Sequence, residues 1–229
     1  MINRFDDKLR ESHQLIAVFS HGNRVLRVIC AIELKKEFSK RKNPRILEIG
    51  CGEGDFTEYL MRYNPGFKID ILDISPEMIE AAKIKLALWR ENINFICEDG
   101  LEFLKNSTEN YDLIVSSWTI HNFSWKEKLE LFKVIRSRLN DGGKLFLLDK
   151  IYPDNLREHE KRFEILLQRY QNYLPEDLKR EVIAHAKQDF SEDYRMDESK
   201  TIKRLKESGF REAKIIDREA EEAILAASK

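Results

Sequence analysis

A short apolar segment at residues 45–49 runs directly into three closely spaced glycines, Gly50, Gly52 and Gly54, and then into an amphipathic stretch. This order predicts a buried strand, a tight turn and a helix. Glycine has no Cβ, so the backbone of such a turn can bend sharply and approach a ligand that a side chain would hold away. The spacing G-x-G-x-G differs from the dinucleotide fingerprint G-x-G-x-x-G. The segment therefore predicts a nucleotide-binding turn at the end of a strand.

Acidic residues end the next two predicted strands. One apolar run ends at Asp73, and a second ends at Asp99, just before Gly100. Asp73 follows the glycines by about 20 residues, the distance at which a carboxylate can accept both hydroxyls of a ribose. Asp73 also precedes a Ser-Pro pair that is typical of a helix start, so helix capping is the alternative role.

Helical and strand patterns alternate along the middle of the chain. Helical periods at residues 56–62, 76–90 and 126–139 each separate two apolar runs. Such alternation predicts βαβ units and a parallel sheet, in which ligands bind outside the carboxyl ends of the strands. The predicted fourth strand begins at Tyr111 and leads to His121. We therefore expect the glycines, the two aspartates and the region near His121 to meet at one edge of the sheet.

The order and spacing of these elements resemble the class I S-adenosylmethionine-dependent methyltransferases. Glu48 with the glycines is similar to their motif I, residues 111–121 to their motif IV, and the pair Gly142-Gly143 to their turn into the fifth strand. The resemblance implies an α/β, Rossmann-like fold with a mostly parallel seven-stranded sheet, helices on both faces and a helical cap. It also implies that the last strand lies antiparallel between its neighbours.

The same resemblance implies S-adenosylmethionine as the cofactor and S-adenosylhomocysteine as its product. Glu48 would orient the methionine moiety through its amino group, Asp73 would hold the ribose, and Asp99 would meet the adenine amino group. A turn-forming role of Asp99 is the alternative. The resemblance further assigns to the cofactor several residues of the turn and of the neighbouring strand ends: Gly50, Cys51, Gly52, Ile74, Met78, Gly100 and, through a backbone carbonyl, Ser116.

His121 is the candidate catalytic residue, because it follows the predicted fourth strand where an acceptor would approach the methyl group. The titration range of an imidazole suits a proton acceptor. The alternative is structural, with the ring packed in the turn at residues 120–123 or bonded to a backbone carbonyl. Transfer by proximity alone, without a base, is also compatible with the sequence.

Cysteine usage and charge bound the class of protein. The three cysteines, Cys30, Cys51 and Cys97, are an odd number without metal-ligand spacing, so neither a disulfide framework nor a metal site is predicted. This usage is typical of the reducing cytoplasm. Lys and Arg (40) nearly balance Asp and Glu (41), which disfavours binding of long nucleic acids, although a local basic patch leaves a nucleic-acid partner open. No signal pattern or membrane-spanning run is found, so we expect neither secretion nor membrane insertion.

The chain of 229 residues is expected to form one methyltransferase domain with four segments. Residues 1–42 have a helical period and would form an N-terminal lid. Residues 43–153 are the cofactor-binding core. Residues 154–195 are charged and helical and would be inserted as a cap, and residues 196–229 would supply a helix and the closing strands. The amphipathic lid and cap would also support a homodimer.

The predicted function is transfer of a methyl group from S-adenosylmethionine to a small-molecule acceptor. The sequence lacks an N-P-P-Y-type motif after the fourth strand, which disfavours methylation of nucleobase or glutamine amino groups. One alternative is a relative that builds carboxy-S-adenosylmethionine or modifies RNA, and another is a non-catalytic S-adenosylmethionine-binding protein. An NAD-dependent oxidoreductase is the third, although G-x-G-x-x-G and a catalytic Tyr-Lys or His constellation are missing.

Overall fold

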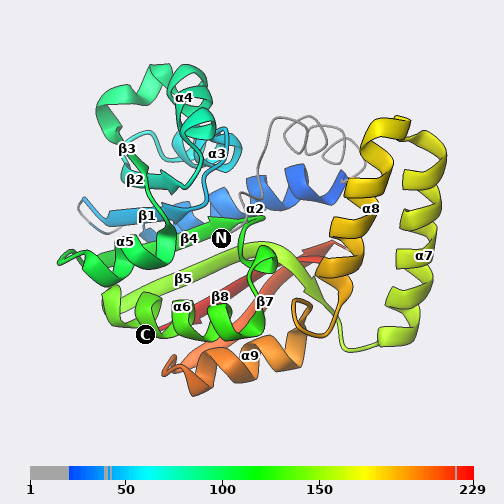
Figure 1. The fold of residues 1–229 in the computed structure, drawn as a ribbon. Helices are drawn as coiled ribbons and strands as arrows, with labels where there is room; N and C mark the ends of the chain where they lie inside the picture. The colour runs from blue at the N-terminus through cyan, green and yellow to red at the C-terminus, as the bar shows by residue number, and fades with distance from the viewer. Residues whose placement is uncertain (1–20, 39–40, 42, 220) are drawn as a thin grey trace.

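The computed structural model describes residues 21–38, 41, 43–219 and 221–229 (Figure 1). In chain order its elements are α2 (His21–Phe38), β1 (Arg45–Ile49), α3 (Asp55–Tyr63), β2 (Lys68–Asp73), α4 (Pro76–Lys85), η1 (Ala87–Asn92), β3 (Ile93–Cys97), α5 (Gly100–Asn106), β4 (Tyr111–Ser117), η2 (Ile120–Asn122), α6 (Trp125–Arg138), β5 (Leu139–Tyr152), α7 (Leu156–Tyr173), α8 (Glu176–Phe190), β6 (Met196–Asp197), α9 (Glu198–Glu207), β7 (Glu212–Glu219) and β8 (Glu222–Ser228). The part of the predicted N-terminal lid before residue 21 lies outside the described residues.

The strands form one sheet in the order β3-β2-β1-β4-β5-β8-β7, with the two-residue strand β6 paired to β5. Strands β1 to β5 are parallel. Strand β8 lies antiparallel between β5 and β7. The predicted mostly parallel sheet and the antiparallel insertion of the last strand are confirmed, and β6 adds a short eighth strand.

Helices cover both faces of the sheet, as predicted (Figure 1). One core lies between the sheet and helices α2, α3 and α4, and the other lies between the sheet and helices α5, α6 and α9. Successive strand residues point to opposite faces, so Ile46 of β1 belongs to the first core and Leu47 to the second. The central strands are therefore apolar on both sides, and their polar residues collect at the strand ends.

The helix predicted at residues 76–90 begins as expected but ends earlier. The Ser75 hydroxyl accepts a hydrogen bond from the Met78 amide, and Pro76 occupies the first turn. Helix α4 ends at Lys85, and η1 follows. Leu86 is fully buried and packs against Gly54, where an added Cβ would lie 2.7 Å from Leu86 Cδ1. The α-helix ends where this tertiary contact forms. The helical period of the sequence carries no information about such a contact.

Helices α7 and α8 form an antiparallel pair beside the carboxyl ends of β4 and β5 (Figure 1). Their contact is an apolar cluster of Tyr170, Leu174, Leu178 and Val182. The helical character predicted for this segment is therefore confirmed. Among the residues that the structure describes, no helix is both long enough and apolar enough to cross a bilayer.

Candidate functional site

The turn between β1 and α3 has three glycines in the left-handed region, with φ of 70° at Gly50, 53° at Gly52 and 84° at Gly54. A Cβ on Gly50 would lie 2.3 Å from the Thr119 side chain, so only glycine fits there. A Cβ on Gly52 would meet nothing within 4 Å. The turn is therefore tightly packed on one side and open in front of Gly52, where a ligand can approach the backbone.

Asp73 lies at the carboxyl end of β2, directly beside this turn. Its Oδ2 accepts a hydrogen bond from the Gly52 amide at 2.9 Å, and its Oδ1 accepts one from the Ser75 amide at 3.0 Å. Burial raises the pKa of Asp73, and these backbone amides oppose that effect. The N-cap of α4 is Ser75 and not Asp73, so the prediction that Asp73 itself caps this helix is wrong. Asp73 links the end of β2 to the open glycine turn.

Glu48 lies behind the turn, in the interior of the protein. It is fully buried, its Oε2 accepts a hydrogen bond from the Thr57 hydroxyl at 2.6 Å, and its Oε1 has no hydrogen-bond partner. Burial raises the pKa of Glu48 to about 8, although the Thr57 hydroxyl and the positive charge of Arg27 oppose this effect. The carboxyl group is therefore mostly protonated at neutral pH.

Asp99 and Ser116 also lie at strand ends, and both bond to the backbone. Asp99 is the N-cap of α5, because its Oδ1 accepts hydrogen bonds from the amides of Leu101 and Glu102. The Ser116 hydroxyl donates to the Ile49 carbonyl at 2.9 Å and joins β4 to β1. The hydrogen bonds of Asp99 agree with the alternative that it has a local structural role at the turn before α5. Its contact with adenine stays a prediction.

The other predicted cofactor residues differ in exposure. Ile74 is exposed at the end of β2, and Met78 is half-buried in the first turn of α4. Cys51 is buried in the glycine turn, and burial raises the pKa of its thiol, so it is not poised as a nucleophile. A Cβ on Gly100 would lie 2.9 Å from Ile49 Cγ2, so this glycine allows close packing of α5 on β1.

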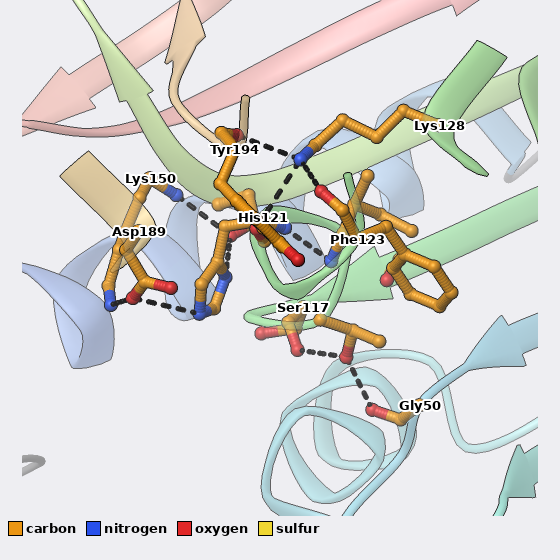
Figure 2. Close-up of polar contacts among 12 residues, drawn as sticks. Gly50, Ser117, His121, Phe123, Lys128, Lys150, Asp189 and Tyr194 are labelled. Carbon is orange, nitrogen blue, oxygen red and sulfur yellow. Dashed lines mark hydrogen bonds and ion pairs between the residues drawn. The ribbon is translucent and has the colours of Figure 1, made fainter. Parts of the chain in front are cut away.

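His121 is the centre of a buried polar cluster next to the glycine turn (Figure 2). Its Nδ1 lies 2.5 Å from Asp149 Oδ1, and its ring is nearly fully buried. Asp149 is fully buried and also accepts hydrogen bonds from the backbone amides of Ile120, His121 and Lys150. The Thr119 hydroxyl lies 3.0 Å from the Gly50 carbonyl oxygen. Asp149 therefore fixes the loop after β4, and Thr119 holds that loop against the glycine turn.

The second ring nitrogen of His121 faces helix α8. His121 Nε2 lies 3.8 Å from Asp189 Oδ2, and His185 Nε2 lies 3.7 Å from the same oxygen. The Lys150 ammonium bonds to Asp189 Oδ2 at 2.7 Å. Although burial opposes it, the Lys150 charge and the two imidazoles hold the pKa of Asp189 down at about 2, so this carboxyl group is ionised. Residues from η2, β5 and α8 thus meet in one cluster.

Comparisons with known proteins agree with this geometry. The family model described as "Methyltransferase domain" matches residues 46–143. An uncharacterized methyltransferase of Staphylococcus carnosus is 31% identical over 153 residues, which are 65% of this chain and 67% of the relative. The chain belongs to the class I S-adenosylmethionine-dependent methyltransferases. Malonyl-[acyl-carrier protein] O-methyltransferase 1 of Ilyobacter polytropus is 43% identical to this methyltransferase over 106 residues, 46% of the chain and 37% of the relative.

Solved structures show the same fold for this methyltransferase. Human N-acetylserotonin methyltransferase in complex with S-adenosylmethionine aligns with a TM-score of 0.66 and 21% identity over 97% of this chain and 55% of that chain. The CurJ carbon methyltransferase aligns with a TM-score of 0.67 and 18% identity over 90% of this chain and 54% of that chain. The methyltransferase thus spans 37% to 51% of the first two curated relatives and just over half of these structures.

The region matched by the family model contains every predicted cofactor residue of this methyltransferase and His121. The two carboxylates that face the His121 ring, Asp149 and Asp189, lie outside it, and the sequence analysis missed them. In the sequence Asp149 follows the apolar run at residues 145–148, which is the signal that identified Asp73 and Asp99, although β5 continues to Tyr152. For His185 and Asp189 the only signal is their spacing of four residues on one predicted helix, and such spacing is common on solvated helix faces.

Proposed function

We propose that this chain transfers a methyl group from S-adenosylmethionine to a small-molecule acceptor. The observation that carries the proposal is the hydrogen bond from the Gly52 amide to Asp73 at the open side of the glycine turn. This bond holds a carboxylate beside the place where the backbone is accessible, as binding of a ribose at a strand end requires. The membership of the chain in the family supports the same cofactor.

The residues of the turn fit the cofactor. The Asp73 carboxylate accepts from the amides of Gly52 and Ser75 and also interacts with the Ile74 amide, and since each carboxylate oxygen has about two acceptor positions, the group can still accept from a ribose hydroxyl. A Cβ on Gly52 would meet nothing within 4 Å, so the methionine and ribose part of the cofactor can approach the backbone there. Glu48 has one buried oxygen without a partner and supports the turn from behind. When bound, S-adenosylmethionine supplies an activated methyl group on a sulfonium, and the protein supplies orientation and exclusion of water.

We propose further that His121 acts on the acceptor. Asp149 binds Nδ1 and thereby fixes the orientation of the ring, which leaves Nε2 directed toward α8. In the simplest role, Nε2 takes the proton of the acceptor during methyl transfer. The ring is nearly fully buried in η2 and lies edge-on to Trp118, as the packing alternative expects, while its hydrogen-bond partner is a side-chain carboxylate and not a backbone carbonyl.

The acceptor is proposed as a small molecule or an acyl group on a carrier protein. The relatives named malonyl-[acyl-carrier protein] O-methyltransferase match this chain over 106 and 140 residues, while α7 and α8 stand beside the strand ends and would cover the acceptor. An acceptor screen therefore includes free carboxylic acids, phenols and a malonyl thioester.

The test is calorimetric titration of the purified chain with S-adenosylmethionine, S-adenosylhomocysteine and NADH, for the wild type and for Asp73→Ala. We expect the two sulfur ligands to bind and NADH not to bind. Loss of hydrogen bonds to a charged group corresponds to roughly 10-fold to 100-fold weaker binding in Asp73→Ala. Asp112→Ala is the matched control, because Asp112 accepts from the Arg45 amide at the opposite edge of the sheet. Absence of binding by both sulfur ligands would overturn the proposal.

A further inference from the structure

We propose that His121, His185 and Asp189 form a binding site for a divalent transition-metal ion. One ligand atom from each residue lies within 4.8 Å of the ligand atoms of the other two. His121 comes from the loop after β4, and His185 and Asp189 come from α8. Figure 2 shows His121 and Asp189 turned toward each other across this cluster.

The distances suit a small metal ion. The Nε2 atoms of His121 and His185 lie 3.8 Å and 3.7 Å from Asp189 Oδ2. Tetrahedral zinc binds nitrogen and oxygen at about 2.0–2.2 Å, which places its ligand atoms roughly 3.4 Å apart. The ligand atoms of the three residues lie within 4.8 Å of one another, so closing the cluster around an ion on Asp189 Oδ1 requires rotation of this carboxylate and side-chain movements of roughly 1 Å.

The donor set has the chemistry of a transition-metal site. Two imidazoles and one carboxylate are ligands that zinc, iron and related divalent ions accept. Asp189 is 4% exposed, and its Oδ1 has no hydrogen-bond partner. A buried carboxylate oxygen without a partner is costly, because the group has lost its water. An ion bound to Oδ1 would compensate for this loss.

The residues around the three ligands also fit a metal. Metal-binding histidines usually donate their second ring N–H to a carboxylate, which orients the ring toward the ion. Asp149 occupies this position on His121 Nδ1. The Lys150 ammonium bonds to Asp189 Oδ2 and therefore leaves Oδ1 available.

Three protein ligands leave at least one coordination position for another group, as in catalytic rather than structural zinc sites. We assign that position to an oxygen atom of the methyl acceptor, such as an enol, a phenol or a carboxylate, and this assignment rests on the proposed function. Coordination would lower the pKa of an acceptor hydroxyl, which would lose its proton to water as it binds, and the resulting oxygen anion would take the methyl group with release of S-adenosylhomocysteine. In the metal-loaded protein, His121 Nε2 is a ligand and does not itself take the proton.

Metal titration of the full chain tests the site. The protein is freed of any histidine tag, treated with chelator and titrated with Co²⁺, whose visible absorption reports four- or five-coordinate binding. We expect one equivalent to bind, Zn²⁺ to displace it, and Zn²⁺ to raise Tm. His185→Ala and Asp189→Asn should weaken Co²⁺ binding by more than the roughly 10-fold to 100-fold that loss of an outer partner costs. His159→Ala is the matched control, because His159 lies on α7 and packs edge-on against Tyr152. This variant should bind Co²⁺ as the wild type does.

Two results would overturn the site. The first is a wild-type protein with no Co²⁺ absorption and no change of Tm with Zn²⁺, which does not depend on any variant folding. The second is unchanged Co²⁺ binding in folded His185→Ala and Asp189→Asn. Titration of the same metal-free sample with S-adenosylmethionine separates the two proposals. Cofactor binding without metal binding removes the metal site alone, and metal binding without cofactor binding supports the site and removes the proposed function.

Discussion

Glu48 should make the stability of the ligand-free protein fall as the pH rises. Burial raises the pKa of this carboxyl group from 4.5 to about 8. Between these values the folded protein holds a proton that the unfolded chain has released. The free energy of unfolding therefore decreases with increasing pH in this window, because the folded state binds more protons than the unfolded state does. The stabilisation is complete below about pH 4.5 and is lost as the pH approaches 8.

The size of the effect follows from the two pKa values. Their difference of about 3.5 pH units corresponds to roughly 5 kcal/mol across the whole window, at about 1.4 kcal/mol per unit. Glu48→Gln cannot ionise, keeps an acceptor for the Thr57 hydroxyl and removes this dependence. Between about pH 5.5 and pH 7.5, the wild type should lose roughly 2–3 kcal/mol relative to the variant.

Urea unfolding followed by tryptophan fluorescence measures the difference, with both proteins studied at the same pH values and without ligand. The difference between the two proteins removes the contribution of other titrating groups. Glu58→Gln is the matched control, because Glu58 lies on α3 and pairs with Arg62 near the surface. If wild type and Glu48→Gln show parallel pH dependence, Glu48 does not ionise in this window and the reasoning from its burial is refuted.

Two further substitutions test the turn and a strand end. Gly50→Ala places a Cβ 2.3 Å from the Thr119 side chain at a φ of 70°, and should cost roughly 3 kcal/mol or more in urea unfolding. Gly66→Ala, where an added Cβ meets nothing within 4 Å, should change stability by less than about 1 kcal/mol, and equal effects would contradict the packing argument. Asp99→Ser keeps a good N-cap for α5 but shortens the side chain, so stability should change by less than about 1 kcal/mol while binding of S-adenosylmethionine weakens in calorimetry. Unchanged affinity would leave Asp99 with its capping role alone.

Local patterns in the sequence were sufficient for the core of the fold. An apolar run followed by Gly50 and Gly52 predicts a strand and then a turn, because the backbone conformations of both depend on only a few neighbouring residues. The same holds for the start of α4 at Ser75 and Pro76. The end of that helix was predicted wrongly, because the contact of Leu86 with Gly54 joins residues far apart in the chain.

In the candidate site, too, the sequence identified some features and only the structure showed the others. Asp73 was identified by its position at a strand end, and the parallel sheet brings all such ends to one edge. Glu48 was also identified as part of the motif, but only the structure shows that it is buried behind the turn and bonded to Thr57. A motif records the order of residues. It does not record on which side of the strand the neighbouring helices pack, and this packing decides whether a side chain such as Glu48 is buried.

The sequence by itself determined the class of fold, the glycine turn and the aspartate beside it, because backbone conformation and strand periodicity are local properties. Only the tertiary structure decided the environment of His121. Its partners Asp149 and Asp189 are 28 and 68 residues away in the chain, on β5 and α8. The docking of α8 beside the sheet brings Asp189 and His185 to the imidazole. Docking depends on the packing of whole helices, which no short pattern of residues records.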